Sequence, residues 1–401
     1  MLGRDLVRPL DDGWRETLDA VARSRGWPTS RDVARLAARV TDLSAAYNDA
    51  SRARAGVRDA GAARLGFSFA RDVPKGAAAV RELVATGVLR LGGVLRVLDV
   101  GAGLGATTWG VVRALEASGA RGAVEVTWVD ADAEALDLAA AVARRRAGHG
   151  AVELRPRTAA RAVGPLDDLG RFGLVLAGQV LSELDVGAPD EVRVERHASL
   201  LRGWLERRVD DHGALVVVEP ALRDRTRHLH RVRDALAASG ATVFAPCLHA
   251  APCPALARDT DWCHEDLPVD LPPWLVPVAR AAGLRHEGLT FSYLVLRRDG
   301  ASLAGVVPAR SGAARLRVVS DAMPSKGKRE AFVCGELASG GGLVPARVRA
   351  MRLDRDATEA NAAWDRLAKG DILTIEPAPQ LDRARIGRGT QVSATSADRQ
   401  T

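Results

Sequence analysis

The sequence lacks any apolar run of the length that a membrane-spanning helix needs. Its opening residues, Met1 to Asp5, contain no apolar signal core, and acidic residues come too early for a transit peptide. We therefore expect a cytoplasmic protein without a membrane partner, and we expect it to be a monomer when free. The apolar share of 47% and the charged share of 27% are ordinary for globular proteins, and 401 residues leave room for two or three domains.

Lysine is scarce: of the 57 basic residues, nearly all are arginines. The four lysines are Lys75, Lys326, Lys328 and Lys369. The net charge of +7 and the isoelectric point of about 9.8 suit a polyanionic partner such as RNA. Abundant arginine and alanine are also what a GC-rich genome imposes on any protein, so the charge by itself favours RNA only slightly.

Cysteine is scarce too, and its placement is uneven. Three of the four cysteines, Cys247, Cys253 and Cys263, fall within 17 residues, and Cys334 stands alone. In a reducing compartment we do not expect disulfides. The clustering points to a shared role for these thiols.

The chain divides into regions of different pattern. Residues 1–80 show helical spacing of apolar side chains, and we interpret them as a helical cap. Lys75 and nearby arginines in this region could touch RNA, but a solvated helix face is the commoner explanation. From about residue 94, strands and helices alternate, which predicts a parallel sheet covered by helices on both faces. The expected strands are 95–100, 124–129, 152–154, 173–177, 214–218 and 241–245, followed by a last, antiparallel strand at 289–296.

These strands predict an α/β fold with the seven-stranded sheet of S-adenosylmethionine (SAM)-dependent methyltransferases, over residues 81–300. A cysteine-rich insertion at 246–288 separates strands six and seven. Short β-like runs between glycine-rich turns then predict a small OB-like β-barrel at 301–378. The polar residues 379–401 are expected to be a disordered tail.

A glycine-rich turn follows the first strand. Asp99 is followed by Gly101, Gly103 and Gly105, and Asp130 ends the second strand. A carboxylate at that strand end can accept both ribose hydroxyls of a nucleoside that lies across the sheet edge. Dinucleotide sites more often have the spacing Gly-x-Gly-x-x-Gly without the leading acid. We therefore predict that these five residues bind SAM rather than NAD.

Residues for methyl transfer are harder to find. The loop after the fourth strand, 178–184, has neither the Asn/Asp-Pro-Pro-aromatic segment of base-amine methyltransferases nor the cysteine nucleophile of cytosine C5 enzymes. Gln179 or Glu183 could contact a substrate, and each could equally cap the loop. The catalytic residues stay unknown at this point.

The cysteines predict a metal site. Four thiolates suit zinc or an iron–sulfur cluster, but the spacing C-x5-C-x9-C is not the C-x2-C pairing common in zinc sites. His249 and His264 could complete a zinc site in place of Cys334. Because Cys247 follows strand six, the site would lie at the sheet edge where ligands bind. With Cys334 as a ligand, the metal would also join the small β domain to the sheet.

At these residues the chain resembles the mitochondrial small-ribosomal-subunit methyltransferase-like assembly factors and their bacterial relatives. The resemblance covers about residues 60–375, and Leu248 stands where relatives usually have proline. The segments that carry it are 99–105, 179–184, 218–220, 245–254, 261–264, 325–329 and 334–335. The resemblance implies a SAM-binding fold, a 4Fe–4S cluster on all four cysteines, and association with small-subunit ribosomal RNA during assembly.

Two classes of function follow. One is a SAM-dependent methyltransferase of ribosomal RNA. The other is a SAM-binding assembly factor, stabilised by its cluster, that binds the small subunit without transferring a methyl group. A weaker third interpretation is a zinc-stapled methyltransferase that acts on a non-RNA substrate.

Overall fold

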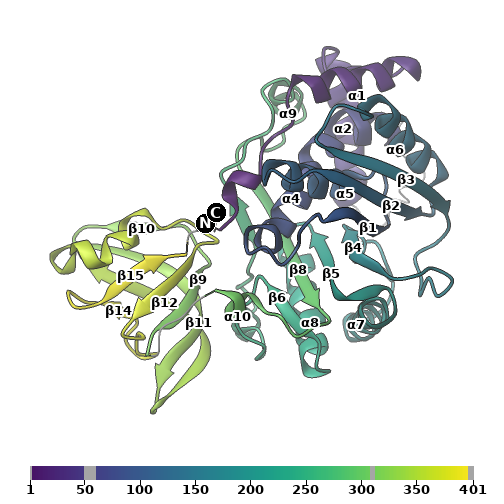
Figure 1. Cartoon of the computed structure of the whole chain (residues 1–401). Helices are drawn as coiled ribbons and strands as arrows, with labels where there is room; N and C mark the ends of the chain where they lie inside the picture. The colour runs from purple at the N-terminus through teal and green to yellow at the C-terminus, as the bar shows by residue number, and fades with distance from the viewer. Residues whose placement is uncertain (1, 49–59, 308–311, 396–401) are drawn as a thin grey trace.

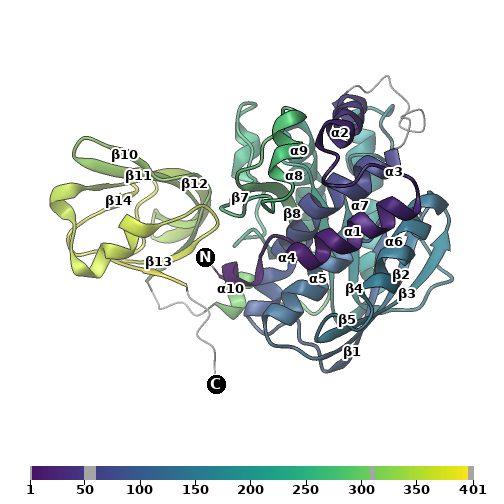
Figure 2. The same ribbon diagram turned by 90° about the horizontal axis from the view of Figure 1, so that it is seen from above.

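A computed structural model of the chain describes residues 2–48, 60–307 and 312–395. The chain forms a large α/β unit and a smaller curled β-sheet that lies to one side of it in both views (Figure 1; Figure 2). Among the described residues, no helix is long and apolar enough to cross a bilayer. Within residues 2–48 and 60–92 the elements are all helical: η1 (Arg4–Leu6), α1 (Asp12–Ser24), α2 (Val33–Asn48), α3 (Ala60–Ala63), a π-helical turn η3 (Arg64–Ser68) and α4 (Phe69–Ala85).

The large sheet has the strand order β3-β2-β1-β4-β5-β8-β6, and β8 runs antiparallel to both of its neighbours. This is the predicted methyltransferase order with its late antiparallel strand, so the fold prediction is confirmed. The sheet has one more strand than predicted, because the short β7 of the insertion pairs with β8. The strands are β1 (Gly93–Val100), β2 (Gly122–Asp130), β3 (Val152–Ala160), β4 (Phe172–Gly178), β5 (Val209–Glu219), β6 (Thr242–Ala245), β7 (Glu265–Leu267) and β8 (Leu289–Arg297).

Helices cover both faces of this sheet (Figure 1). Neighbouring residues of a strand point to opposite faces, so Val97 packs in the core beneath α4, α5 and α6, while Leu98 packs in the core beneath α7 and α8. The first core also contains the apolar side chains of α1 and α2, so the N-terminal helices share it with the sheet. The covering helices are α5 (Ala106–Ala117), α6 (Ala133–Arg146), α7 (Asp190–Arg207) and α8 (Arg223–Ala238).

In the described part of the insertion and of the link to the small sheet, the helices are short. These are η4 (Pro254–Ala257), α9 (Val276–Ala281) and α10 (Leu303–Val306). The small sheet follows in the order β14-β12-β11-β9-β13-β15, with β10 paired to β11, around a core of its own that contains Trp364. Its elements are β9 (Ala314–Val318), β10 (Met323–Ser325), β11 (Lys328–Ser339), β12 (Gly342–Leu353), η5 (Asp354–Asp356), η6 (Glu359–Arg366), β13 (Ile372–Glu376), β14 (Arg385–Ile386) and β15 (Gln391–Ala394).

The prediction of a disordered tail from residue 379 is wrong as far as residue 395. Strand β15 pairs with β13, and β14 pairs with β12. Ile386 and Val392 are buried in the core of the small sheet, and these two apolar side chains among polar neighbours are enough to dock both strands. Residues 396–401, the rest of the predicted tail, lie outside the described residues.

Candidate functional site

The turn after β1 is shaped by glycines. Gly101 has φ +65°, and a Cβ there would lie 2.5 Å from Cγ2 of Val180 in the loop after β4. Gly103 has φ +51°, and no described atom lies within 4 Å of the place that its Cβ would take. Only glycine adopts this backbone without strain. The turn therefore packs against the β4 loop at Gly101 and opens toward free space at Gly103.

Asp130 meets this turn from the end of β2. Its Oδ2 accepts a hydrogen bond from the Gly103 N–H over 2.7 Å, and its Oδ1 accepts one from the Asp132 N–H over 2.9 Å. A carboxylate has about four acceptor sites, so half of them remain for a ligand. The third glycine, Gly105, precedes α5 with φ +76°. The structure thus brings Asp130, Gly101, Gly103 and Gly105 to one edge of the sheet.

Asp99, the fifth predicted residue, lies beneath the turn rather than at its surface. Its side chain is buried, its Oδ2 accepts a hydrogen bond from the Thr108 hydroxyl over 2.6 Å, and its Oδ1 has no partner among the described residues. Burial raises the pKa of Asp99 to about 7, although the hydrogen bonds from Thr108 oppose this. Asp99 therefore supports the turn from below.

The loop after β4 is held by a carboxylate from the segment 218–220, to which the sequence assigned no role. Glu219, at the end of β5, is buried, and its two oxygens accept hydrogen bonds from the Leu181 and Ser182 N–H groups over 2.9 and 3.2 Å. Burial raises the pKa of Glu219 to about 7. Gln179 has φ +60° and donates its N–H to the Val218 carbonyl over 2.6 Å. The loop is therefore tied to β5 along its backbone.

Helix α4 contributes an ion pair to the same edge. Lys75 Nζ donates to Asp72 Oδ1 over 2.8 Å, and Asp72 also forms a hydrogen bond with the Gln179 side chain. The expectation of a solvated helix face is wrong for Lys75, which is only 7% exposed. Its pKa is lowered by burial, against the attraction of Asp72. The i, i+3 spacing allows this pair, but it gave no signal that the pair is buried, because the helix packs against a loop about a hundred residues away.

The four cysteines line one cavity of about 40 Å³, together with His249, Arg233 and Arg347. Cys247 follows β6, Cys253 precedes η4, Cys263 precedes β7, and Cys334 lies on β11 of the small sheet. The prediction that Cys334 joins the cluster from another sheet therefore agrees with the geometry of the cavity.

The cysteine thiols influence one another. Burial raises the pKa of the Cys263 thiol to about 11, and Cys247 adds to the effect. Burial also raises the pKa of Cys334 well above its ordinary value, and the three other cysteines add to this. These thiols are therefore neutral as they stand, and a positively charged group bound among them would be needed to stabilise their thiolates.

The kind of metal site is constrained by the side-chain positions. Within residues 2–48, 60–307 and 312–395, no three His, Cys, Asp or Glu side chains are close enough to hold a single ion. His249 Nε2 is 3.7 Å from Cys334 Sγ, but His264 does not line the cavity, and its Nε2 is 3.0 Å from Lys369 Nζ. A mononuclear zinc site that uses His264 therefore does not fit.

Helix α8 holds the cysteine loops in place. Arg227 Nη1 donates to the carbonyl oxygens of Ala255, Arg258 and Asp261 over 3.2, 2.7 and 2.7 Å. Asp234 accepts a hydrogen bond from the Cys253 N–H over 2.9 Å.

Two further α8 side chains reach the same loops. Arg233 donates to the carbonyl oxygens of Ala251 and His249, and His230 Nε2 lies 3.0 Å from the Cys263 carbonyl. The sequence did not reveal the role of these residues, because its pattern in α8 is that of a basic amphipathic helix.

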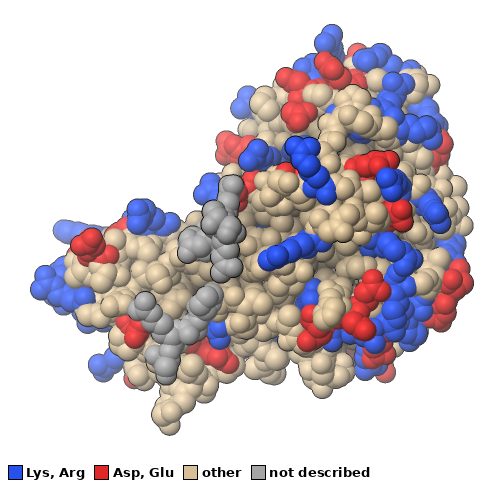
Figure 3. All heavy atoms as spheres, viewed as in Figure 1, with Lys and Arg blue, Asp and Glu red and all other residues tan. Residues whose placement is uncertain are grey.

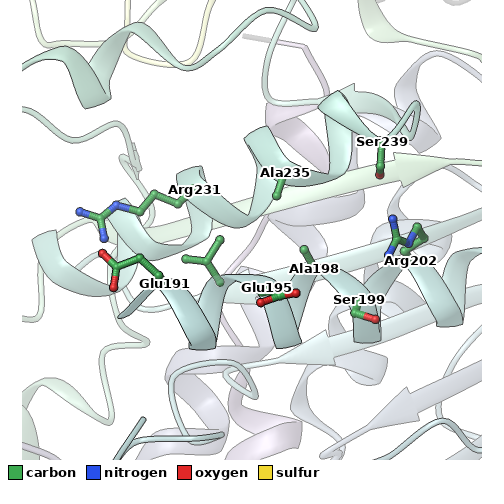
Figure 4. Close-up of a pocket in the computed structure, with 9 residues that line it drawn as sticks. Glu191, Glu195, Ala198, Ser199, Arg202, Arg231, Ala235 and Ser239 are labelled. Atoms are coloured by element: carbon green, nitrogen blue, oxygen red, sulfur yellow. The ribbon is translucent and has the colours of Figure 1, made fainter. Parts of the chain in front are cut away.

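A second groove, of about 580 Å³, lies between α7 and α8 (Figure 4). Its walls carry charged and small side chains, and Figure 4 shows Glu191 and Arg231 close together at one end. None of the residues predicted to bind SAM or metal lines this groove, although the structure describes all of them. It is separate from the glycine turn and from the cysteine cavity.

Comparison with known proteins gives a family. The family model described as mitochondrial small ribosomal subunit Rsm22 matches residues 94–339, which is more than half of the chain. The match includes the glycine turn, the β4 loop and all four cysteines. None of the curated proteins matches the chain.

Several solved methyltransferase structures are similar in part. The precorrin-6y C5,15-methyltransferase of Geobacter metallireducens is 14% identical, with 54% of this chain and 88% of that one covered and a TM-score of 0.31. A methyltransferase of Pyrococcus furiosus is 13% identical, with coverages of 55% and 82% and a TM-score of 0.31. The plantazolicin methyltransferase BpumL in complex with SAH is 8% identical, with coverages of 67% and 98% and a TM-score of 0.35. Because these similarities are distant, the assignment of the fold rests on the strand order described above and not on them.

Proposed function

Because this chain belongs to the Rsm22 family of the mitochondrial small ribosomal subunit, we propose that it binds SAM and acts on the small ribosomal subunit as a methyltransferase of its RNA. The observation that carries the SAM part is the open glycine turn. Gly103 faces free space beside Asp130, at the carboxyl edge of a methyltransferase sheet. Five residues form the proposed cofactor site: Asp99, Gly101, Gly103, Gly105 and Asp130.

Methyl transfer from SAM needs little from the protein beyond position. The methyl group is already activated by the sulfonium, so binding the acceptor in line with it supplies most of the rate. Glu219 uses its carboxylate on the backbone of the β4 loop, which suits an orienting role. Gln179, at the start of that loop, is the side chain we expect nearest to an acceptor.

A non-catalytic assembly factor is the second candidate. The β4 loop has neither a cysteine nucleophile nor the Asn/Asp-Pro-Pro-aromatic segment, and this supports binding without transfer. Both candidates share the SAM site and the ribosomal partner, so they differ only in whether the methyl group is used.

We also propose that Cys247, Cys253, Cys263 and Cys334 hold a 4Fe–4S cluster. Three sulfur donors from the two loops on either side of η4 and one from strand β11 surround a single cavity, which fits the donor set of such a cluster. A bound cluster would supply structural linkage between the two sheets. A zinc-stapled enzyme with a non-RNA substrate is less well supported, because His264 contacts Lys369 and does not line the cysteine cavity.

The RNA partner is supported by the family and by the net charge of +7. On the face shown in Figure 3, Lys and Arg side chains are spread among Asp and Glu rather than gathered in one patch. Location in the cytoplasm stays a prediction, since the family description names the mitochondrial subunit. A monomeric free state also stays a prediction.

We keep the division into a helical region (1–80), a SAM-binding unit (81–300) and a small β unit from residue 301 as a proposal. The separate core around Trp364 supports the last boundary. The shared core of the N-terminal helices and the large sheet supports treating the first two regions as one folding unit.

The decisive experiment compares cells that contain the wild-type protein, the Gly103→Asp variant or no protein. Ultraviolet crosslinking measures contact with RNA, and mass spectrometry maps methyl marks in small-subunit RNA. A mark lost in Gly103→Asp, while crosslinking to that RNA persists, supports a methyltransferase. Crosslinking and normal subunit assembly without any change in methylation support the assembly factor. Absence of small-subunit RNA from the crosslinks would contradict both.

A further inference from the structure

The helical segment from α3 to α4 passes over the edge of the sheet where SAM is proposed to bind. At one end, Arg64 Nη1 donates to Asp132 Oδ2 over 2.8 Å, just beyond the end of β2. At the other end, Asp72 is hydrogen-bonded to the Gln179 side chain, just beyond the end of β4. From Arg64 to Lys75 the segment is about 16 Å long at the rise of an α-helix. It therefore spans the three strand ends in the order β2, β1, β4.

The middle of α4 is pressed onto the start of α5. A Cβ on Gly76 would lie 2.5 Å from the Thr107 carbonyl oxygen, and one on Gly178 would lie 2.2 Å from the Thr107 hydroxyl. Thr107 thus stands between α4 and the end of β4. Because these approaches need glycine on both sides, Lys75 is held close to the first turn of α5 and to the β4 end.

A π-helical turn precedes α4 directly. Residues Arg64–Ser68 form this turn, and Pro74 lies inside the helix that follows. Such turns are frequent at functional sites. Here the helix that follows carries Asp72 and Lys75.

The ion pair has unused hydrogen-bonding capacity. The Lys75 ammonium has three donors, and among the described residues its one acceptor is Asp72. Asp72 accepts from Lys75 and is bonded to Gln179, which leaves carboxylate lone pairs free. Arg71 adds a second positive charge, with its Nε 3.6 Å from Asp72 Oδ1. A buried pair with spare donors and acceptors is costly unless something else satisfies them.

We propose that Lys75 and Asp72 bind the amino-acid end of SAM, with the Lys75 ammonium on the α-carboxylate and the Asp72 carboxylate on the α-ammonium. The order of the strands in the sheet gives the direction in which the ligand would lie. A ligand with its ribose on Asp130 at β2 crosses the glycine turn after β1 and reaches β4 with its other end. That other end is a zwitterion, and the α4 pair offers the complementary charges. This inference rests on the proposed binding of SAM.

The test measures the affinity of purified protein for two ligands by isothermal titration calorimetry. One is S-adenosylhomocysteine, which has the amino-acid end, and the other is 5′-methylthioadenosine, which lacks it. Lys75→Met is expected to weaken binding of S-adenosylhomocysteine by about 10- to 100-fold, as for the loss of a hydrogen bond to a charged group. Binding of methylthioadenosine should stay within about twofold of wild type, since that ligand makes no contact with Lys75.

Three companion variants make the result specific. Lys326→Met removes an exposed lysine from the turn after β10 and should leave both affinities unchanged. Lys75→Arg keeps the charge and should recover part of the loss. The double variant Asp72→Asn/Lys75→Met leaves no buried charge unpaired, so it gives the same measurement if Lys75→Met alone fails to fold.

The outcomes separate the two proposals. Equal weakening of both ligands, or no weakening of either, in a folded Lys75→Met protein would overturn the role of the pair. If the wild-type protein binds neither ligand, the proposed SAM site itself fails. Selective loss of S-adenosylhomocysteine binding supports both.

Discussion

Arg317 of β9 donates from Nη2 to Glu82 Oε1 of α4 over 2.7 Å, and so joins the small sheet to the N-terminal helices across 235 residues of sequence. The Tyr293 hydroxyl donates to the other oxygen of Glu82 over 2.8 Å. Burial alone would raise the pKa of Glu82, but Arg317 and Arg81 outweigh it and hold that pKa below its ordinary value. The interface between the two sheets therefore contains a buried, charged contact.

This contact is next to the cysteine cavity. Arg81 Nη2 donates to Glu265 Oε2 over 3.0 Å, and Glu265 comes two residues after Cys263. In the small sheet, Arg317 is the register partner of Cys334. Glu265 thus follows one proposed metal ligand in the chain, and Arg317 pairs across two strands with another. The structure therefore links α4, the cysteine loops and the β domain.

Arg317→Leu is expected to lower the free energy of unfolding by about 3–5 kcal/mol, because it leaves Glu82 buried without its main partner. Urea unfolding followed by circular dichroism measures this. The double variant Arg317→Leu/Glu82→Leu should be less destabilised than the sum of the two single variants, by about 1–3 kcal/mol. Strict additivity would mean that the two side chains do not interact in solution.

Cys334→Ser is expected to reduce bound iron well below four per chain and to expose the link around residues 300–314 to protease. The reason is that Cys334 is the only cysteine on the small sheet, so a cluster ligated there ties the two sheets together. Iron and sulfide are assayed after anaerobic purification, and limited proteolysis is followed by mass spectrometry. Colourless wild-type protein with one zinc per chain would contradict the cluster. Proteolysis unchanged by the substitution would contradict the link.

Gly103→Asp is expected to weaken SAM binding by at least about 100-fold, because its side chain enters the open space beside Asp130 and adds a second negative charge there. Calorimetry with SAM measures the loss. Gly119→Asp is the matched control, since Gly119 also has a positive φ and open space around its Cβ, but lies beyond the far end of α5. Normal SAM affinity in Gly103→Asp, or an equal loss in Gly119→Asp, would count against the site.

Asp99 should make the protein less stable as the pH rises. Its pKa is about 7 in the folded protein, against 3.8 for an ordinary Asp, so the folded state binds more protons than the unfolded state between these values. Stability from this group is therefore lost from about pH 4 to about pH 7, and the full cost of about 4 kcal/mol is present above pH 7.

Asp99→Asn removes this dependence. Between pH 5 and pH 8, the stability of the variant relative to wild type should rise by about 2–3 kcal/mol. Urea unfolding without ligand at several pH values measures the difference. Asp211→Asn, at a side chain that is 82% exposed, serves as the control. If the free energy of unfolding changes with pH in the same way for Asp99→Asn and wild type, burial does not shift the pKa of the Asp99 carboxyl group.

Patterns local in the chain predicted the fold and part of the site. Alternating apolar runs predicted the strands of the large unit, because a buried strand needs a continuous run of apolar side chains on both faces. The glycines and Asp130 could be assigned because a turn and a strand end have fixed positions relative to the sheet edge. The cysteine clustering likewise marked one cavity. The failed prediction at residues 379–395 involved short strands with one or two apolar anchors each, which leave too weak a pattern.

The sequence by itself determined the order of elements along the chain and the set of cysteines, and it led to the proposed nucleoside site, since each depends on residues near one another in the chain. Only the tertiary structure decided that Lys75 is buried beside Asp72 and Gln179, that Glu219 holds the β4 loop, and that α8 braces the cysteine loops. It also placed Arg317 against Glu82. These are contacts between segments from 16 to 235 residues apart, apart from the pair within α4, and they arise from how the helices pack on the sheet. No local pattern encodes such packing, because each of these polar side chains looks like an ordinary surface residue in the sequence. Its partner lies on another segment and comes close only in the folded structure.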